Sequence, residues 1–329
     1  MPPTRIGVVG AGFVAGRHVE SLTSLPDVVV TAVCDPRPDR AAALCGTAYP
    51  DVHQMLDREA LDAVYVCVPP YAHGEPERAA LARGLPLFVE KPLDLDLSTA
   101  EELAAEIEAA GVPTATGYHW RYYDTVERAA ELLADRPPRL LSASWLDRTP
   151  GSPWWAVRDR SGGQLLEQAT HLFDLCRLLA GEVTEVTAVA AGSPAGQGDI
   201  DHVAAGTLRF ASGAVGAVTT TCLLRRGHRV GLEVVADGMV LALTERELVV
   251  DDGERRTVPV GVDPFRREDA DFVAAVRGEP VTPRVPYAEA LRSHRLTVAV
   301  ARAAATGVPV SLTVPAAGPV PASAGGART

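Results

Sequence analysis

The sequence contains no asparagine, and Lys91 is its only lysine, so 30 of its 31 basic residues are arginine. A lysine ammonium is a compact charge that can lose its proton in a suitable environment, whereas a guanidinium stays charged. Because arginine supplies every other fixed cation of the chain, we expect the single lysine to be a catalytic residue. A genome-wide bias toward arginine is the alternative explanation.

Cysteine is also scarce, with five residues that share no Cys-x-x-Cys or Cys/His ligand spacing. Their odd number and scatter predict neither a disulfide framework nor a zinc site, so we expect no metal and a reducing, cytoplasmic location. No apolar run approaches the length of a membrane span. A strand-like run follows Arg5 directly, so we also expect no signal peptide.

Basic tracts are absent, and the formal net charge of the 329-residue chain is −11. Both features argue against a nucleic acid or an acidic membrane as a partner. With 47% hydrophobic and 22% charged residues, the composition is that of a soluble globular protein. The length is sufficient for two domains, each with its own core.

The first 117 residues alternate short apolar runs with helical patterns. Near-continuous apolar strands separated by helices are typical of a parallel sheet that is covered on both faces. This part is therefore predicted to be a doubly wound α/β domain. The expected strands are 6–9, 28–34, 63–68, 87–89 and 114–116, and the expected helices are 13–25, 37–44, 72–83 and 98–110.

The second half instead places several strand-like runs in succession, which predicts an α+β domain with a large, mostly antiparallel open sheet. We expect domains at 1–120 and 121–314, followed by a loose tail at 315–329 that is rich in Ala, Pro, Gly and Ser. The expected strands are 140–146, 183–191, 204–210, 214–221, 230–236 and 239–243. Helices are expected at 125–133, 164–180, 265–277 and 287–306, the last two packed on one face of this sheet.

A glycine-rich turn, Gly10-Ala11-Gly12-Phe13-Val14-Ala15, follows the first predicted strand and opens the first predicted helix. Gly10 allows a tight turn, and Gly12 lets the backbone approach a pyrophosphate at the helix N-terminus. Such a pattern alone is weak, because tight turns need glycine for structural reasons. Asp35 closes the second strand, where a carboxylate can bind ribose hydroxyls, so together they predict a dinucleotide site.

Asp35 favours NAD, because its charge would repel the 2′-phosphate of NADP. Arg37 lies two residues further on and could neutralise such a phosphate. An ordinary arginine in the first turn of a helix is the simpler explanation for Arg37. We expect NAD, with NADP left open.

A second motif, Glu90-Lys91-Pro92, lies at the carboxyl end of a predicted strand, where open α/β sheets bind ligands. With the glycine-rich turn, it resembles the glucose-fructose oxidoreductase, inositol dehydrogenase and MocA (Gfo/Idh/MocA) family. The resemblance covers most of the chain and includes the segments 68–73, 118–122 and 162–174. It implies a Rossmann domain followed by a substrate-binding domain that also forms oligomers, here a homodimer or homotetramer.

The same resemblance assigns residues to the cofactor and to the substrate. The expected cofactor contacts are Gly10, Gly12, Phe13, Val14, Asp35, Arg37, Val68, Pro69, His73, Glu90, Lys91 and Arg121. Tyr118, His119 and Glu167 are expected near the substrate. Valine at 68, tyrosine at 71, histidine at 119 and glutamate at 167 depart from the residues common in the family, so we expect hydride transfer to be kept and substrate recognition to differ.

Glu167 and His171 are four residues apart in a predicted helix, so their side chains would share one face and could hydrogen-bond. A surface ion pair is the alternative, but the preceding Gly162-Gly163 and the Lys91 motif favour an acid/base pair. In the resembling family a histidine here is catalytic. We therefore expect His171 and Lys91 to be the catalytic residues, without deciding which of them moves the proton.

Trp154 and Trp155 precede this segment and offer flat faces of the kind that stack on a sugar ring, with Arg158 nearby. Packing in a core is the alternative for at least one of them. The predicted activity is hydride transfer between a nicotinamide and a secondary alcohol or ketone of a sugar, amino sugar or cyclitol. A NAD-binding regulator of the same fold and a reductase of another C=O or C=N group are the alternatives.

Overall fold

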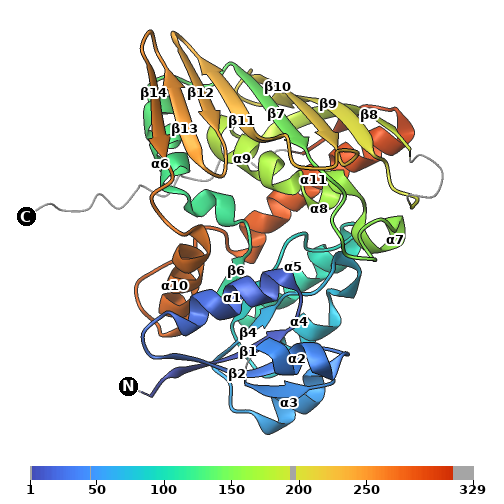
Figure 1. Ribbon diagram of the computed structural model, residues 1–329, viewed down its shortest axis with the longest axis vertical. Helices are drawn as coiled ribbons and strands as arrows, with labels where there is room; N and C mark the ends of the chain where they lie inside the picture. The colour runs from blue at the N-terminus through green and yellow to red at the C-terminus, as the bar shows by residue number, and fades with distance from the viewer. Residues whose placement is uncertain (1, 45, 193–197, 314–329) are drawn as a thin grey trace, which may run out of the picture.

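A computed structural model describes residues 2–44, 46–192 and 198–313. Cys45 and the predicted tail at 315–329 lie outside these ranges. Two sheets form the described structure, a six-stranded sheet and a nine-stranded sheet that lie one above the other in Figure 1. Within the described residues, no helix combines the length and the apolarity that crossing a bilayer requires.

The six-stranded sheet is parallel throughout and has the order β3-β2-β1-β4-β5-β6. Strands β4, β5 and β6 are fully buried and β1 nearly so, which agrees with a sheet covered on both faces and confirms the predicted doubly wound fold. The order reverses between β1 and β4, and ligands bind beside the carboxyl ends of strands at such a point. The strands are β1 (Thr4–Val9), β2 (Val28–Cys34), β3 (Thr47–Tyr49), β4 (Ala63–Val66), β5 (Leu87–Val89) and β6 (Thr114–Thr116).

Helices and short 3-10 turns connect these strands and cover the two faces of the sheet. The α-helices are α1 (Phe13–Thr23), α2 (Pro38–Leu44), α3 (Val52–Arg58), α4 (Glu75–Leu81) and α5 (Ser98–Ala110). The 3-10 turns are η1 (Pro70–Ala72) and η2 (His119–Tyr122), and η2 leads into α6 (Asp124–Leu133). The sequence patterns did not indicate β3 and α3.

The nine-stranded sheet has the order β14-β13-β12-β11-β7-β10-β9-β8-β15. Only β7 and β10 pair in parallel, which confirms a large, mostly antiparallel sheet. The strands are β7 (Leu140–Leu146), β8 (Val183–Ala191), β9 (Val203–Phe210), β10 (Val215–Thr221), β11 (Arg229–Ala236), β12 (Met239–Leu243), β13 (Glu247–Asp251), β14 (Arg255–Pro259) and β15 (Val310–Ser311). The last three were not expected from the sequence.

One face of this sheet is covered by helices, whereas β8, β9 and β10 expose alternate side chains on the other. Val189 and Val215 are 67% and 47% exposed there. An apolar open face is suited to association with another copy of the chain. The homodimer or homotetramer stays a prediction.

Two predicted helices differ in the structure. The pattern over 164–180 is interrupted, giving α8 (Gln164–Glu167) and α9 (Thr170–Ala180), with the four-residue α7 (Arg158–Ser161) before them. The predicted packing of the helix at 265–277 on the nine-stranded sheet is wrong. This helix, α10 (Pro264–Val276), packs beside α1, and its Phe272 and Val273 join the core of the parallel sheet (Figure 1).

The long helix α11 (Tyr287–Thr306) joins the two halves. Its N-terminal residues Tyr287 and Ala290 belong to the core of the parallel sheet, and Leu296 and Val300 belong to the core of the nine-stranded sheet. The C-terminal helices α10 and α11 therefore both pack against the half that contains the parallel sheet.

Candidate active site

A cleft of about 1380 Å³ lies between the two halves of the molecule. We call its two sides the nucleotide wall and the substrate wall. The nucleotide wall comprises cleft residues that follow β1, β2, β4 and β5, which include Gly10, Gly12, Phe13, Val14, Asp35, Arg37, Arg40, Val68, Pro69, Glu90 and Lys91. The substrate wall comprises cleft residues from 145 to 171, which include Trp145, Asp147, Arg148, Trp154, Trp155, Arg160, Glu167, Gln168 and His171.

The glycine-rich turn of the nucleotide wall has the space that a dinucleotide needs. Gly10 has φ of +95°, and a Cβ there would lie 2.3 Å from the carbonyl oxygen of Cys67. A Cβ on Gly12 would meet nothing within 4 Å, so that position opens into the cleft. Gly12 caps α1 with no side-chain hydrogen bond, and the first turn carries no acid. The uncapped N–H groups and the helix dipole fit a pyrophosphate.

Asp35 follows β2 and is fixed by backbone groups. Its Oδ2 accepts a hydrogen bond of 2.9 Å from the N–H of Ala11, and its Oδ1 accepts one of 2.9 Å from the N–H of Arg37. A carboxylate oxygen can accept more than one hydrogen bond, so Asp35 can still bind ribose hydroxyls. Arg37 and Arg40 line the cleft beside it.

Lys91 crosses the cleft to the substrate wall. Its Nζ donates to the carbonyl oxygen of Glu167 at 2.9 Å and to Oε1 of Glu167 at 3.1 Å. The other carboxylate oxygen of Glu167 accepts a hydrogen bond of 2.7 Å from Nε1 of Trp155. An ammonium has three donors. Two of them point at Glu167, which leaves one for a substrate oxygen.

His171 lies in the first turn of α9, and the predicted hydrogen bond between it and Glu167 is wrong. The two residues belong to different helices, because the helix is interrupted at Gln168 and Ala169. Glu167 binds Lys91 and Trp155 instead. Burial first, and then the nearby charge of Lys91, lower the pKa of His171 well below 6.5. His171 is therefore a neutral imidazole near pH 7.

Aromatic rings enclose His171. Its ring centroid lies 4.8 Å from that of His119 and 6.1 Å from that of Trp145, to which it is nearly parallel. Burial and the charge of Lys91 also lower the pKa of His119, to about 3. His119 is predicted to bind substrate, but the structure places it behind His171, outside the residues that line the cleft.

Three further predicted contacts fall outside the cleft. Nδ1 of His73 donates to the carboxylate of Glu77 at 2.6 Å, and the hydroxyls of Tyr118 and Thr170 hydrogen-bond at 2.8 Å, both in buried surroundings. Arg121 forms ion pairs with Asp174 and Glu289, in which its Nη2 lies 2.6 Å from Oδ1 of Asp174 and 2.9 Å from Oε1 of Glu289. The contacts of Tyr118 and Arg121 join the two halves, whereas His73 pairs within the parallel-sheet half. The predicted cofactor or substrate contacts of these three side chains have no counterpart among the residues that line the cleft.

Arg158 is predicted to contact the substrate, but it does not line the cleft. Its guanidinium instead binds the carbonyl oxygen of Asp199 and the carboxylate of Asp201. Arg160 lines the cleft in its place, with its guanidinium 5.5 Å from the ring centroid of Tyr71. Sequence reasoning also missed Trp145, Asp147, Arg148 and Gln168. Trp145 lies near the end of β7 and Asp147 directly follows the strand, so the end of a predicted strand beside the predicted loop was the signal that could have indicated them.

Comparison with protein families gives two matches along the chain. The model described as an oxidoreductase family with a NAD-binding Rossmann fold matches residues 4–118. The model of the GFO/IDH/MocA C-terminal domain matches residues 137–241. The first match contains the nucleotide wall, and the second contains the substrate wall.

Individual relatives agree. The chain is 32% identical over 260 residues to myo-inositol 2-dehydrogenase of Thermotoga maritima, covering 75% of this chain and 77% of the relative. It is 26% identical over 300 residues to inositol 2-dehydrogenase of Rhizobium meliloti, covering 85% and 91% of the two chains.

Solved structures share the whole fold. GenD2 from gentamicin A biosynthesis, in complex with NAD, superposes with a TM-score of 0.84 at 24% identity, covering 95% of this chain and 97% of that chain. Levoglucosan dehydrogenase, in complex with NADH and levoglucosan, gives a TM-score of 0.82 at 21% identity, covering 94% and 99%. The chain is a NAD-binding oxidoreductase and belongs to the Gfo/Idh/MocA family.

Proposed function

We propose that the protein oxidises a secondary alcohol of a sugar, amino sugar or cyclitol, reversibly, with NAD as the hydride acceptor. The carrying observation is that Lys91 and the neutral imidazole of His171 line the same cleft as the glycine-rich turn and Asp35. The inositol dehydrogenases among its relatives support a polyhydroxylated substrate. Bound NAD would supply the site that accepts the hydride.

Lys91 is proposed to hold the reacting oxygen. One ammonium donor remains beyond the two that bind Glu167, and it is available to the substrate hydroxyl. As the hydroxyl becomes a carbonyl, a positive charge next to its oxygen stabilises the negative charge that develops there. Glu167 keeps the ammonium in place from the opposite wall.

His171 is proposed to take the hydroxyl proton. A base must be unprotonated, and burial keeps this imidazole neutral. In the reverse direction, the protonated ring returns the proton to the carbonyl oxygen.

Trp154 is proposed to stack on the substrate ring. It is half-buried in the substrate wall, whereas Trp155 is 1% exposed and packs against Ile200 and Cys222. Flat apolar rings stack on the C–H face of sugars. The two neighbouring tryptophans therefore have different roles, one toward the substrate and one toward Glu167.

A spectrophotometric screen tests the proposal. Wild-type protein and Lys91→Met are mixed with NAD or NADP and with a panel of sugars, amino sugars and inositols, and reduced nicotinamide is followed by its absorbance. We expect turnover with NAD in the wild type and a loss of about 10³-fold or more in Lys91→Met, because charge stabilisation at the reacting oxygen is removed.

NADH binding, measured by fluorescence, is the control. We expect Lys91→Met to bind NADH within a few-fold of the wild type, because the glycine-rich turn and Asp35 are unchanged. Equal turnover in the two proteins would contradict the role of Lys91. Turnover only with keto substrates and NADH would indicate a reductase, and NADH binding without any turnover would favour the regulator.

A further inference from the structure

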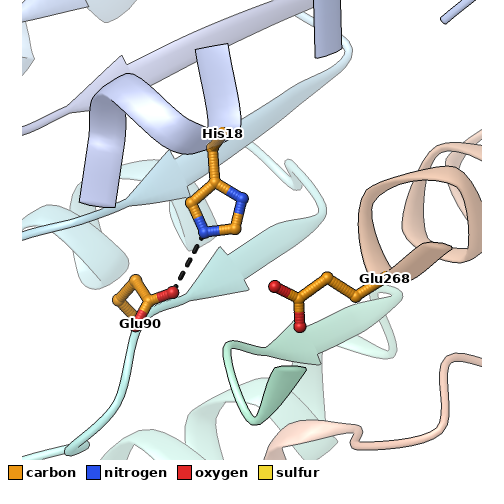
Figure 2. A group of neighbouring side chains, drawn as sticks. All are labelled: His18, Glu90 and Glu268. Carbon is orange, nitrogen blue, oxygen red and sulfur yellow. Dashed lines mark hydrogen bonds and ion pairs between the residues drawn. The ribbon is translucent and has the colours of Figure 1, made fainter. Parts of the chain in front are cut away.

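Behind Lys91 lies a fully buried cluster of ionisable groups, which we call the His18 cluster: His18, Glu90, Glu268 and Asp269. Figure 2 shows His18 on α1 with Glu90 on one side and Glu268 pointing toward both. His18, Glu268 and Asp269 are 0% exposed and Glu90 is 4% exposed. Isolated buried charges are expensive, so this arrangement requires pairing.

The geometry of the ring identifies the pairing. Nδ1 of His18 lies 2.8 Å from Oδ1 of Asp269, and Nε2 lies 3.0 Å from Oε1 of Glu90. A neutral imidazole has only one N–H, so two contacts with carboxylates are both satisfied when the ring carries two protons. In agreement, the two carboxylates outweigh burial and raise the pKa of His18 well above 6.5.

The same geometry argues against a metal ion, although His18, Glu90 and Glu268 are close enough to share one. A metal needs an unprotonated ring nitrogen. Here Nε2 is already directed at Glu90. Burial raises the pKa of Glu268 well above 4.5, so without a cation beside it this side chain is an uncharged acid.

Glu90 connects the cluster to the catalytic lysine. Its Oε1 faces His18, and its Oε2 accepts a hydrogen bond of 3.0 Å from the backbone N–H of Lys91. Gly117 leaves the room for this side chain, since a Cβ there would lie 2.1 Å from Oε1 of Glu90. The carboxylate thus spans from the buried ring to the peptide that carries Lys91.

We propose that His18 is a positioning residue, a buried imidazolium that fixes Glu90 and, through Glu90, the backbone of Lys91. The proposal rests on the proposed role of Lys91. It ties three separate parts of the chain together, because His18 belongs to α1, Glu90 follows β5, and Asp269 belongs to α10. The orientation of the catalytic ammonium therefore depends on a helix from the C-terminal half.

The surroundings favour retention of this charge. The rings of Tyr65, Phe88 and Phe265 lie around His18, at 5.3, 4.7 and 5.4 Å between centroids, and shut out water. The other charged or titratable groups near the cluster include Cys67 after β4, the hydroxyl of Tyr65 in β4, His119 in η2 and Asp263 before α10. Burial raises the pKa of the Cys67 thiol, so it is uncharged and cannot replace either carboxylate.

Asp269→Asn is the main test variant, and His18→Gln is the second. Asparagine keeps the shape but removes one of the two charges that hold the proton on the ring. We expect kcat to fall about 10- to 100-fold, because a misplaced catalytic group loses this much, while the Kd for NADH changes less than threefold. The ratio of variant to wild-type kcat should also fall as the pH rises from 6 to 9, as His18 loses its proton.

Glu268→Gln is the matched control, because glutamine resembles an uncharged acid in shape. We expect its kcat to stay within twofold of the wild type. An equal loss in Glu268→Gln and Asp269→Asn, or a pH-independent loss accompanied by weaker NADH binding, would show a packing role and overturn the proposal. A stoichiometric metal in the purified protein, absent from His18→Gln, would overturn it too.

Lys91→Met is measured alongside to separate the two proposals. If Lys91→Met retains turnover, the proposed function fails whatever the other variants do. If Lys91→Met is inactive while Asp269→Asn and His18→Gln match the wild type at every pH, the role of His18 fails and the proposed function stands.

Discussion

The two walls of the cleft hold their functional groups in different ways. The nucleotide wall relies on the backbone: two glycines leave space, the N-terminus of α1 is uncapped, and backbone N–H groups fix Asp35. The substrate wall relies on side chains held by other side chains. Trp155 holds Glu167, and the rings of His119 and Trp145 enclose His171.

Because of this difference, substitutions in the two walls should change different measurable properties. A side chain added to the nucleotide wall blocks a ligand or clashes with the backbone, so it should change cofactor affinity or stability. A side chain trimmed from the substrate wall releases another side chain, so it should change turnover. Lys91 links the two walls. Its backbone is part of the nucleotide wall, and its ammonium binds Glu167 of the substrate wall.

Gly12→Ala gives the largest expected effect on this comparison. A Cβ at Gly12 meets no protein atom within 4 Å, so the fold should keep its stability. The same methyl group occupies the space where the pyrophosphate approaches the backbone. We expect the Kd for NADH to rise about 100-fold, equal to about 2.7 kcal/mol, with an unchanged midpoint of unfolding.

Gly10→Ala is the matched variant, in which the added methyl group clashes with the protein itself rather than with the cofactor. Its Cβ would lie 2.3 Å from the carbonyl oxygen of Cys67, at a φ of +95° that suits glycine. We expect a lower midpoint of unfolding as well as weaker NADH binding. If Gly12→Ala were the destabilised variant of the two, the glycine-rich turn would have a structural role only.

The nucleotide wall could be predicted because its features are local in sequence. Gly10 and Gly12 act within one turn, and Asp35 acts at the end of one strand, so short motifs carry the information. The parallel sheet was also accessible, because buried strands are continuous apolar runs. Strands such as β14 were not, because all five of its residues are exposed and mostly polar.

The substrate wall was harder to predict because long-range partners decide where its side chains point. Helical spacing alone paired Glu167 with His171, but Lys91 is 76 residues away from Glu167 and binds it instead. Arg158 and Arg160 could not be told apart in a loop, since only the position of Asp199 selects between them. Likewise, α10 packs on α1 through contacts that no local pattern shows.

Trp155→Phe sharpens the comparison on the substrate wall. Phenylalanine preserves most of the buried ring but removes the N–H that donates to Glu167 at 2.7 Å. Hydrogen bonds to charged groups contribute about 1.5–3 kcal/mol. We expect kcat/KM to fall about tenfold, while the Kd for NADH stays the same.

The neighbouring Trp154→Phe serves as the control for Trp155→Phe. Trp154 makes no contact with Glu167 in the described hydrogen bonds, and its ring is replaced by another flat ring, so we expect a change in KM with little change in kcat. An equal fall of kcat in both variants would mean that the size of the two tryptophan rings, and not the hydrogen bond from Trp155 to Glu167, determines turnover.

The smallest expected effect comes from two histidines beside the cleft: His18, which is buried and charged, and His119, which is partly buried and neutral. The raised pKa of His18 means that its stabilisation is complete below pH 6.5 and is lost as the pH rises through its folded value. The pKa of His119, lowered to about 3, has the opposite sign. Its contribution is complete above pH 6.5 and is lost as the pH falls below it.

His119→Gln should therefore remove part of the acid sensitivity. At pH 6, an unfolded histidine with a pKa near 6.5 gains about 0.8 kcal/mol by binding a proton that the ring in the folded protein does not take. Urea unfolding of the wild type and His119→Gln at pH 7.5 and pH 6 measures this term. We expect the wild type to lose about 0.8 kcal/mol more than the variant between the two conditions. An equal loss would mean that His119 is protonated inside the folded protein, so the substrate wall would hold a cation beside His171, and a neutral base there would no longer be supported.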